Sequence, residues 1–319
     1  PMLLMDTPTF PAETSPTHIT IEECLSRLGA GIIEPDIIVA LSDLSRHQVR
    51  YVSREWTTLP DSHRISTLEL VAKLASERLD LDFRRFLRAA LTDPVPAHRV
   101  IALTNLWEDD SRSLLEEVLR LAVVDPSAEV QASAIAHLTA AFEGADDVDV
   151  RSADLIEAFA SLVARIADSP NAPYAVRVRA IEALGVVPQT VEIRALINAA
   201  WEHGDTALAV AALLGIAHSH ESRWRDLVRP ELESDDAEIR YGALRALGAI
   251  GTADDVETIA KCLLDEDRDV RLAAIAALGE IAGPGAVRVL RNRANSAPQD
   301  EQDAITDALD EALLGSDFR

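Results

Sequence analysis

The chain has 319 residues, of which 48% are hydrophobic but only 4% are aromatic, and its formal net charge is −24. Nucleic acids bind basic surfaces, so this charge disfavours a DNA- or RNA-binding function. The two cysteines, Cys24 and Cys262, are too few for a disulfide framework, and no apolar run reaches the length of a membrane span. The sequence therefore predicts a cytoplasmic protein that does not enter a membrane.

The first 59 residues show no clean repeat. Residues 1–18 contain four prolines but no basic region followed by an apolar one, so we expect a mobile N-terminal arm rather than a secretory signal. Residues 19–59 carry helical patterns, and we expect them to cap the structure that follows. The expected helices in this cap are Ile21–Leu28, Asp36–Leu44 and His47–Thr57.

From residue 60 onward a helical phrase recurs about eight times, most clearly in Asp267–Ile281. Its first position, which we call the marker, is followed seven residues later by leucine in every copy. Positions 0, 3 and 7 share one face of a helix, so each phrase predicts the second helix (helix B) of a hairpin. The markers are Thr67, Arg99, Gln131, Arg177, Ala207, Arg240, Arg271 and Gln302. The leucines are Leu74, Leu106, Leu138, Leu184, Leu214, Leu247, Leu278 and Leu309.

Each phrase is preceded by a second helical segment, which we expect to form the first helix (helix A) of its hairpin. The expected A helices are Ser111–Val124, Ala153–Ala167, Val191–Trp201, Glu221–Glu231, Ala253–Leu264 and Gly285–Arg293. Hairpins at a fixed period stack on one another. Residues 60–319 therefore predict an all-α fold, a right-handed α-α superhelix without strands.

One interval is longer than the others. The markers are otherwise 30 to 33 residues apart, but Gln131 and Arg177 are separated by 46 residues. The extra residues of this insertion near 143–173 fall in the acidic segment Glu143–Arg151 and in Ala167–Pro173, and both segments are predicted to form loops.

The repeated phrase resembles the HEAT-like repeat, especially its short bacterial form known from phycobilisome lyase-type proteins. The residues that carry the resemblance are Asp267, Val270, Arg271, Ala274, Leu278 and Gly279, and Ser234, Asp235, Ile239, Arg240, Ala243, Leu247 and Gly248. The resemblance covers about residues 60–314 and implies a solenoid. It also raises two enzymatic alternatives, a phycobilin lyase-like protein that handles a tetrapyrrole and a metal-dependent deoxyhypusine hydroxylase-like enzyme.

The repeated arginines form a ladder along the predicted stack. Asp93, Asp235 and Asp267 precede three of them by a few residues, in the turn between helices A and B. We expect the arginines to bond turn carboxylates and helix-end carbonyls of their own or the next layer. A phosphate-binding ladder is the alternative.

Histidine raises the question of a metal. His218 and His220 follow one B helix, but residues two apart do not share a helix face. A single His-Glu pair, His220-Glu221, contrasts with the several pairs that hydroxylases of this fold use to hold iron. We therefore expect no metal, no cofactor and no catalytic residue, with His218 and His220 as weak metal candidates.

The predicted groove along the B helices is the remaining candidate site. Many of its outward positions are alanine, with scattered charges between them, which suits a helix or an extended segment better than a metabolite. We expect a non-enzymatic scaffold that binds a protein or peptide of basic character, although the sequence leaves enzymatic activity and oligomeric state open. The candidate partner-binding residues are Glu69, Glu108, Arg179, Glu182, Tyr241, Arg245 and Glu280.

Overall fold

The computed structural model describes residues 19–143 and 153–316, and this part of the chain contains helices and loops but no strand. The chain forms two compact units, Pro1–Asp109 (unit 1) and Asp110–Arg319 (unit 2). The predicted N-terminal arm and residues 144–152 of the insertion lie outside the described residues. The predicted boundary between a cap and a solenoid at residues 59 and 60 stays a prediction.

Unit 1 contains six α-helices in its described part, and the three predicted N-terminal helices are confirmed to within a few residues. Local capping explains two of them: Thr20 accepts a bond from the backbone of Glu23, and Ser45 and Gln48 form a reciprocal capping box. The α-helices are α1 (Ile21–Gly29), α2 (Pro35–Ile38), α3 (Arg46–Glu55), α4 (Asp61–Glu77), α5 (Arg84–Ala90) and α6 (Pro96–Thr104). The 3₁₀ turns η1 (Val39–Leu41) and η2 (Trp56–Thr58) follow α2 and α3.

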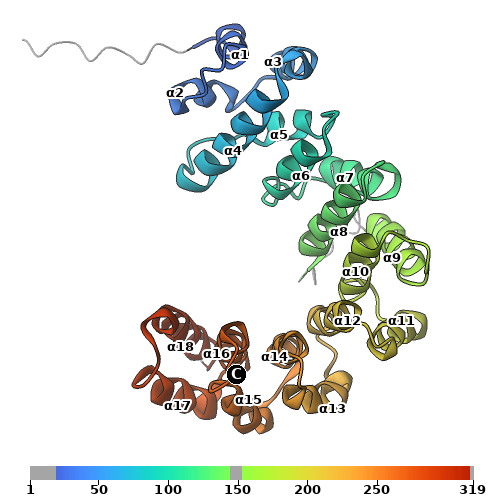
Figure 1. The fold of residues 1–319 in the computed structure, drawn as a ribbon, viewed down its shortest axis with the longest axis vertical. Coiled ribbons are helices and arrows are strands. Elements are labelled where there is room, and N and C mark those ends of the chain that lie inside the picture. Colours follow the sequence, from blue (N-terminus) through green and yellow to red (C-terminus); the bar gives the residue numbers. More distant parts are fainter. Residues whose placement is uncertain (1–18, 144–152, 317–319) are drawn as a thin grey trace, which may run out of the picture. The chain divides into compact units, whose positions relative to one another are not determined.

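The described part of unit 2 contains six helical hairpins stacked in sequence order (Figure 1). The A helices are α7 (Arg112–Val124), α9 (Ala153–Ala167), α11 (Val191–Glu202), α13 (Arg225–Val228), α15 (Val256–Cys262) and α17 (Gly283–Ala294). The 3₁₀ turns η4 (Ser222–Trp224) and η5 (Arg229–Glu233) flank α13, and η6 (Ala253–Asp255) precedes α15. The B helices are α8 (Ala128–Phe142), α10 (Tyr174–Ala183), α12 (Thr206–Ser219), α14 (Ala237–Ile250), α16 (Arg268–Ile281) and α18 (Gln302–Ser316), with η7 (Gln299–Glu301) before α18.

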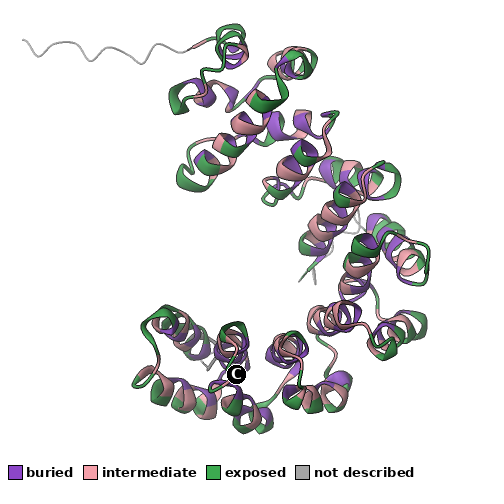
Figure 2. Ribbon diagram, viewed as in Figure 1, coloured by how far each residue is buried: buried purple, intermediate pink, exposed green. Residues whose placement is uncertain are grey.

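The B helices of unit 2 form one layer and the A helices form the other. Each B helix contacts the B helix of the next hairpin as well as its own A helix. Figure 1 shows the B helices along the inner side of the arc that unit 2 forms, and Figure 2 shows buried residues where the two layers face each other. The prediction of an all-helical solenoid of stacked hairpins is confirmed.

Glycines let successive B helices approach closely. A Cβ added to Gly185 in the α10 hairpin would lie 2.1 Å from the carbonyl oxygen of Gly215 in α12. A Cβ on Gly248 would lie 2.5 Å from a carboxylate oxygen of Glu280 in α16. In both places the glycine leaves room for a polar side chain of the next helix, His218 or Glu280.

The predicted repeat frame is wrong by two residues in α12. Asp205 caps α12 as Asp267 caps α16, and four residues after these caps come Ala209 and Arg271. The residue equivalent to the buried leucines is therefore Ile216, which is fully buried, whereas Leu214 is half-buried.

Candidate functional site

The arginine ladder is structural, and its best-formed members, Arg240 and Arg271, tie their own hairpin to itself and to the next. In α14, NH1 of Arg240 donates to the carbonyl of Ser234 at 2.9 Å, while Nε and NH2 donate to Asp265 of the next hairpin, both at 2.8 Å. Because the guanidinium stabilises the ionised carboxylate, the pKa of Asp265 is lowered from its usual value. These arginines already have carboxylate and carbonyl partners, which argues against a phosphate ladder.

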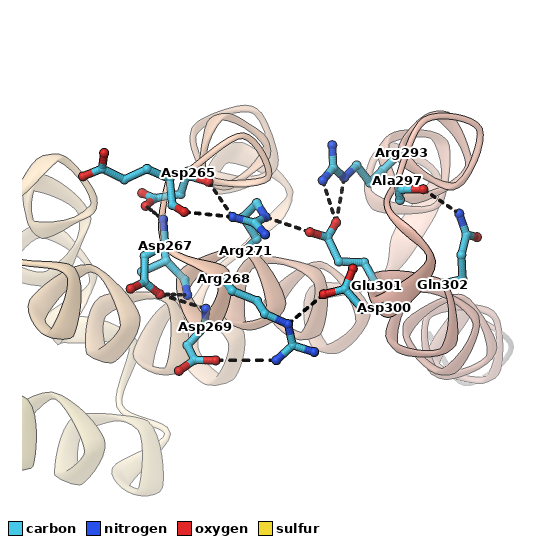
Figure 3. Close-up of polar contacts among 12 residues, drawn as sticks. Asp265, Asp267, Arg268, Asp269, Arg271, Arg293, Ala297, Asp300, Glu301 and Gln302 are labelled. Carbon is cyan, nitrogen blue, oxygen red and sulfur yellow. Dashed lines mark hydrogen bonds and ion pairs between the residues drawn. The ribbon is translucent and has the colours of Figure 1, made fainter.

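Figure 3 shows the same arrangement one layer on. Arg271 donates to the carbonyl of Asp265 at 2.9 Å and to Glu301 at 2.7 Å, and Arg293 binds the other oxygen of Glu301. Glu301 is fully buried, so both guanidinium groups compensate for the loss of its hydration.

In unit 1 the ladder begins with an arginine that the repeat frame did not select. Arg64 in α4, three residues before the expected marker Thr67, donates to the buried carboxylate of Asp93 at 2.9 Å. Trp56 donates to the same oxygen at 2.7 Å, and Arg99 donates to the backbone carbonyl of Asp93.

A second row of contacts joins the beginnings of the B helices in unit 2. The side chain of the first residue of one helix donates a hydrogen bond to a carboxylate at the start of the next helix. The hydroxyl of Tyr174 donates to Asp205 at 2.6 Å, and the hydroxyl of Thr206 donates to Asp236 at 3.0 Å. Arg268 likewise bonds Asp300 at 2.8 Å. The corresponding first residue of α14 is Ala237, which has no polar side chain, so the row is interrupted between α14 and α16.

An open groove with a volume of ≈ 730 Å³ lies at this interruption, on the solvent-facing surface of α14 and α16. We call it the α14–α16 groove. Its acidic rim is formed by Glu238, Asp267 and Asp269 at the starts of the two helices. The other lining residues are Val210, Ala237, Tyr241, Arg245, Leu272, Ala273 and Ala276.

The groove brings together two of the predicted partner-binding residues, and a third lies beside it. Tyr241 and Arg245 line the groove, and NH1 of Arg245 lies 3.5 Å from a carboxylate oxygen of Glu280. Burial raises the pKa of Glu280 from its usual value, while Arg245 opposes that shift.

The other predicted partner-binding residues lie elsewhere. Arg179 and Glu182 pair with each other on α10 at 2.7 Å. Glu69 and Glu108 are exposed residues of unit 1, and Glu108 lines a separate hollow of ≈ 270 Å³ there. The structure thus brings Tyr241, Arg245 and Glu280 together and does not add Glu69 or Glu108 to the groove.

His218 connects three successive B-helix hairpins, which the sequence analysis did not foresee. Its Nδ1 lies 2.6 Å from Glu143 at the end of α8, and its Nε2 lies 3.9 Å from Glu182 of α10. The carboxylates of Glu182 and, next, Glu143 favour the protonated imidazole and raise the pKa of His218 above its ordinary value of 6.5. The pKa of Glu182 is lowered although burial opposes this, because His218 and Arg179 both stabilise its charge.

His220 takes a different position from His218. It ends α12 in the left-handed backbone conformation, with φ of 50°. Its neighbour Glu221 lies 3.8 Å from Arg194 and 3.1 Å from Arg223. Among the residues that the structure describes, no group of three or more His, Cys, Asp or Glu side chains could hold a metal ion.

The repeat identity follows from a match to a family model. The model for HEAT repeats matches residues 193–266 and 226–310. The matched residues together run from 193 to 310. They span the α11 to α18 hairpins, which carry the α14–α16 groove and the best-formed part of the arginine ladder.

Several solved structures are similar to this chain in fold. The complex of CpcE and CpcF of phycocyanin lyase from Nostoc sp. PCC7120 has 19% identity over 90% of this chain and 98% of that chain, with a TM-score of 0.48. YibA of Escherichia coli has 16% identity over 96% and 99%, with a TM-score of 0.42. Human deoxyhypusine hydroxylase has 14% identity over 83% and 96%, with a TM-score of 0.36. A search of curated proteins found no match.

None of the described helices combines the length and the apolar character needed to cross a bilayer.

Proposed function

We propose that this protein is a non-enzymatic scaffold that binds a protein or peptide in the α14–α16 groove. The observation that carries the proposal is the groove itself, an open hollow of ≈ 730 Å³ at outward positions of two adjacent HEAT-repeat helices. Its floor is apolar and shallow because Ala273 and Ala276 are small, and Tyr241 adds an amphipathic ring of the kind that is enriched at interfaces.

The shape of the groove favours a polypeptide over a small metabolite. Ligand pockets bury most of a small molecule, whereas this hollow is open along the helix surface. A helix or extended segment laid across it would contact both α14 and α16.

The acidic rim disfavours the tetrapyrrole alternative. Bilins carry carboxylate side chains, and Glu238, Asp267 and Asp269 would repel them at the starts of α14 and α16. Visible absorbance in the purified protein would favour that alternative instead.

Site-specific photo-crosslinking in the native organism tests the proposal. A photoreactive amino acid is placed at Ala276 in the groove and, as a control, at the exposed position Glu257 on α15 in the other layer of the same hairpin. We expect a covalent adduct with one other protein from position 276 and none from position 257. Absence of an adduct at 276, or the same adducts from both positions, would refute a binding role for the groove.

A further inference from the structure

The rim of the α14–α16 groove carries three acidic side chains, of which only Asp269 has an ion-pair partner among the described residues. Glu238 is exposed and forms no ion pair there. Asp269 is also exposed and has one basic neighbour, Arg268, at 3.9 Å, whose Nε is bound to Asp300. One oxygen of Asp267 caps α16 through the backbone nitrogens of Asp269 and Val270.

The surroundings increase this negative potential. Residues 201–319 contain 24 acidic and 12 basic residues. On α18, the B helix next to α16, Asp303 and Asp307 are exposed and form no ion pair with described residues. A cation that approaches this face is therefore attracted over a distance of about 8 Å at physiological salt.

The far end of the groove holds an arginine that is paired with a carboxylate. Arg245 lies seven residues after Glu238 on α14, which is about 10 Å along the helix. Its side chain is 42% exposed and is engaged by Glu280 at 3.5 Å. The groove thus has an acidic rim at the helix starts and an ion pair at its far end, with an apolar floor between them.

The distribution of apolar atoms matches one type of side chain. Lysine and arginine bury their aliphatic stems along apolar surface while the charged head stays at a polar rim. Leu272 and Ala273 offer such a surface, and Tyr241 offers an aromatic face for the cation. Carboxylates at the helix starts then receive the head group through charge-assisted hydrogen bonds.

We propose that the α14–α16 groove binds a basic segment of a partner protein, with one arginine or lysine side chain lying along Leu272 and its charged group among Glu238, Asp267 and Asp269. This inference rests on the proposed function and names the chemistry of the partner. A second copy of this chain is a poor occupant, because two proteins that each carry a formal charge of −24 repel one another.

Peptide selection on the full-length protein tests this inference. A phage-displayed library of random peptides is selected against the chain, and the enriched peptides are synthesised. Their dissociation constants are measured by fluorescence anisotropy with the wild type, with Ala276→Trp, which fills the groove, and with Glu238→Gln/Asp269→Asn. The matched control is Asp303→Asn/Asp307→Asn, which removes the same charge from the neighbouring helix outside the groove lining.

We expect enriched peptides that contain arginine or lysine beside an apolar residue. Binding should be lost in Ala276→Trp and weakened about tenfold in Glu238→Gln/Asp269→Asn, since loss of about 1.4 kcal/mol of binding free energy is a factor of ten. The control should weaken binding by less than about threefold. Replacing the arginine of the peptide by citrulline, which keeps its shape but not its charge, should weaken binding as much as Glu238→Gln/Asp269→Asn, the rim variant, does.

The outcomes separate the two proposals. Peptides that require an open groove but contain no basic residue, or that bind the rim variant as tightly as the wild type, overturn the basic-segment inference and leave the peptide-binding function standing. Equal losses in the rim variant and the control overturn the inference too, because the general field of the face would then be responsible. If no peptide is enriched, or if Ala276→Trp leaves binding unchanged, the groove function itself falls.

Discussion

Two arginines on the same helix should differ sharply in their contribution to stability. Arg240 and Arg245 both lie on α14, so the same substitution to methionine at each position changes helix propensity equally. The side chain of Arg240 is 11% exposed and makes three hydrogen bonds, two of them to Asp265. Arg245 is 42% exposed and makes one long contact to Glu280.

The magnitudes follow from these surroundings. Removing one member of a buried ion pair costs about 3–5 kcal/mol, because the remaining charge is left without a partner. Asp265 is itself 11% exposed and keeps a hydrogen bond from the backbone of Asp267, so water and backbone recover part of that cost. We expect Arg240→Met to destabilise the α14–α16 interface by about 2–4 kcal/mol and Arg245→Met by less than about 1 kcal/mol.

Hydrogen exchange is the suitable assay, because a stacked array need not unfold in one step. Amides in the turn from Asp265 to Val270 should lose protection in Arg240→Met and keep it in Arg245→Met, and urea midpoints by circular dichroism should show the same order. Equal losses of protection in the two variants would refute the argument that the ladder, rather than surface charge pairing, joins the layers.

Three further predictions concern the packing and the pH dependence of unit 2. Leu278→Ala should lower the free energy of unfolding by about 2–5 kcal/mol because it leaves a cavity in a fully buried site. Leu309→Ala, at a half-buried site of the last layer, should lower it by less, and similar urea midpoints for the two variants would contradict this. Gly185→Ala should destabilise the protein by about 1–3 kcal/mol, since the new methyl group meets the carbonyl oxygen of Gly215, while Gly285→Ala, with its nearest contact at 3.8 Å, should be neutral in a thermal melt. Because the pKa of His218 in the folded protein is raised above 6.5, the stabilisation that His218 gives to the α8, α10 and α12 contacts is fully present below about pH 6.5 and is lost as the pH rises through the raised value. An NMR titration that places this pKa at or below 6.5 would count against the prediction, as would a His218→Gln variant with the same pH dependence of stability as the wild type.

The sequence predicted the hairpins well because each is specified locally. Ala153–Ala167 was predicted from apolar spacing and is the observed extent of α9. Pro230 lies where the predicted helix from Glu221 to Glu231 becomes the short α13 flanked by 3₁₀ turns, since proline removes a backbone donor. The resemblance to HEAT repeats was likewise confirmed over residues 193–310.

The register of α12 was harder to predict because almost every residue of that helix is apolar. A leucine at position 214 and an isoleucine at position 216 fit a helical pattern equally well, so periodicity does not select between them. The signal that does select is the N-cap: Asp205 stands four residues before Ala209, as Asp267 stands four before Arg271.

The candidate site was predicted in part. Outward positions of the B helices identified Tyr241 and Arg245, which line the groove. Ala237 also lines the groove, but an alanine at the start of a B helix does not identify it from the sequence, because α8 begins with Ala128 in the same way. The bond between His218 and Glu143 joins residues 75 apart across the longest interval of the repeat, and no local pattern specifies it.

The arginine ladder gives the last layers of unit 2 a direction. At the α14–α16 and α16–α18 junctions, the earlier hairpin presents a guanidinium group toward the hairpin that follows it, and the later hairpin presents a carboxylate toward the hairpin that precedes it, as Arg240 and Asp265 illustrate. Cutting the stack between α14 and α16 would therefore expose a cationic end on one fragment and an anionic end on the other. Such ends are complementary head to tail but repel head to head, so the two fragments should reassemble in the native order, and neither fragment should pair with itself through the cut surface.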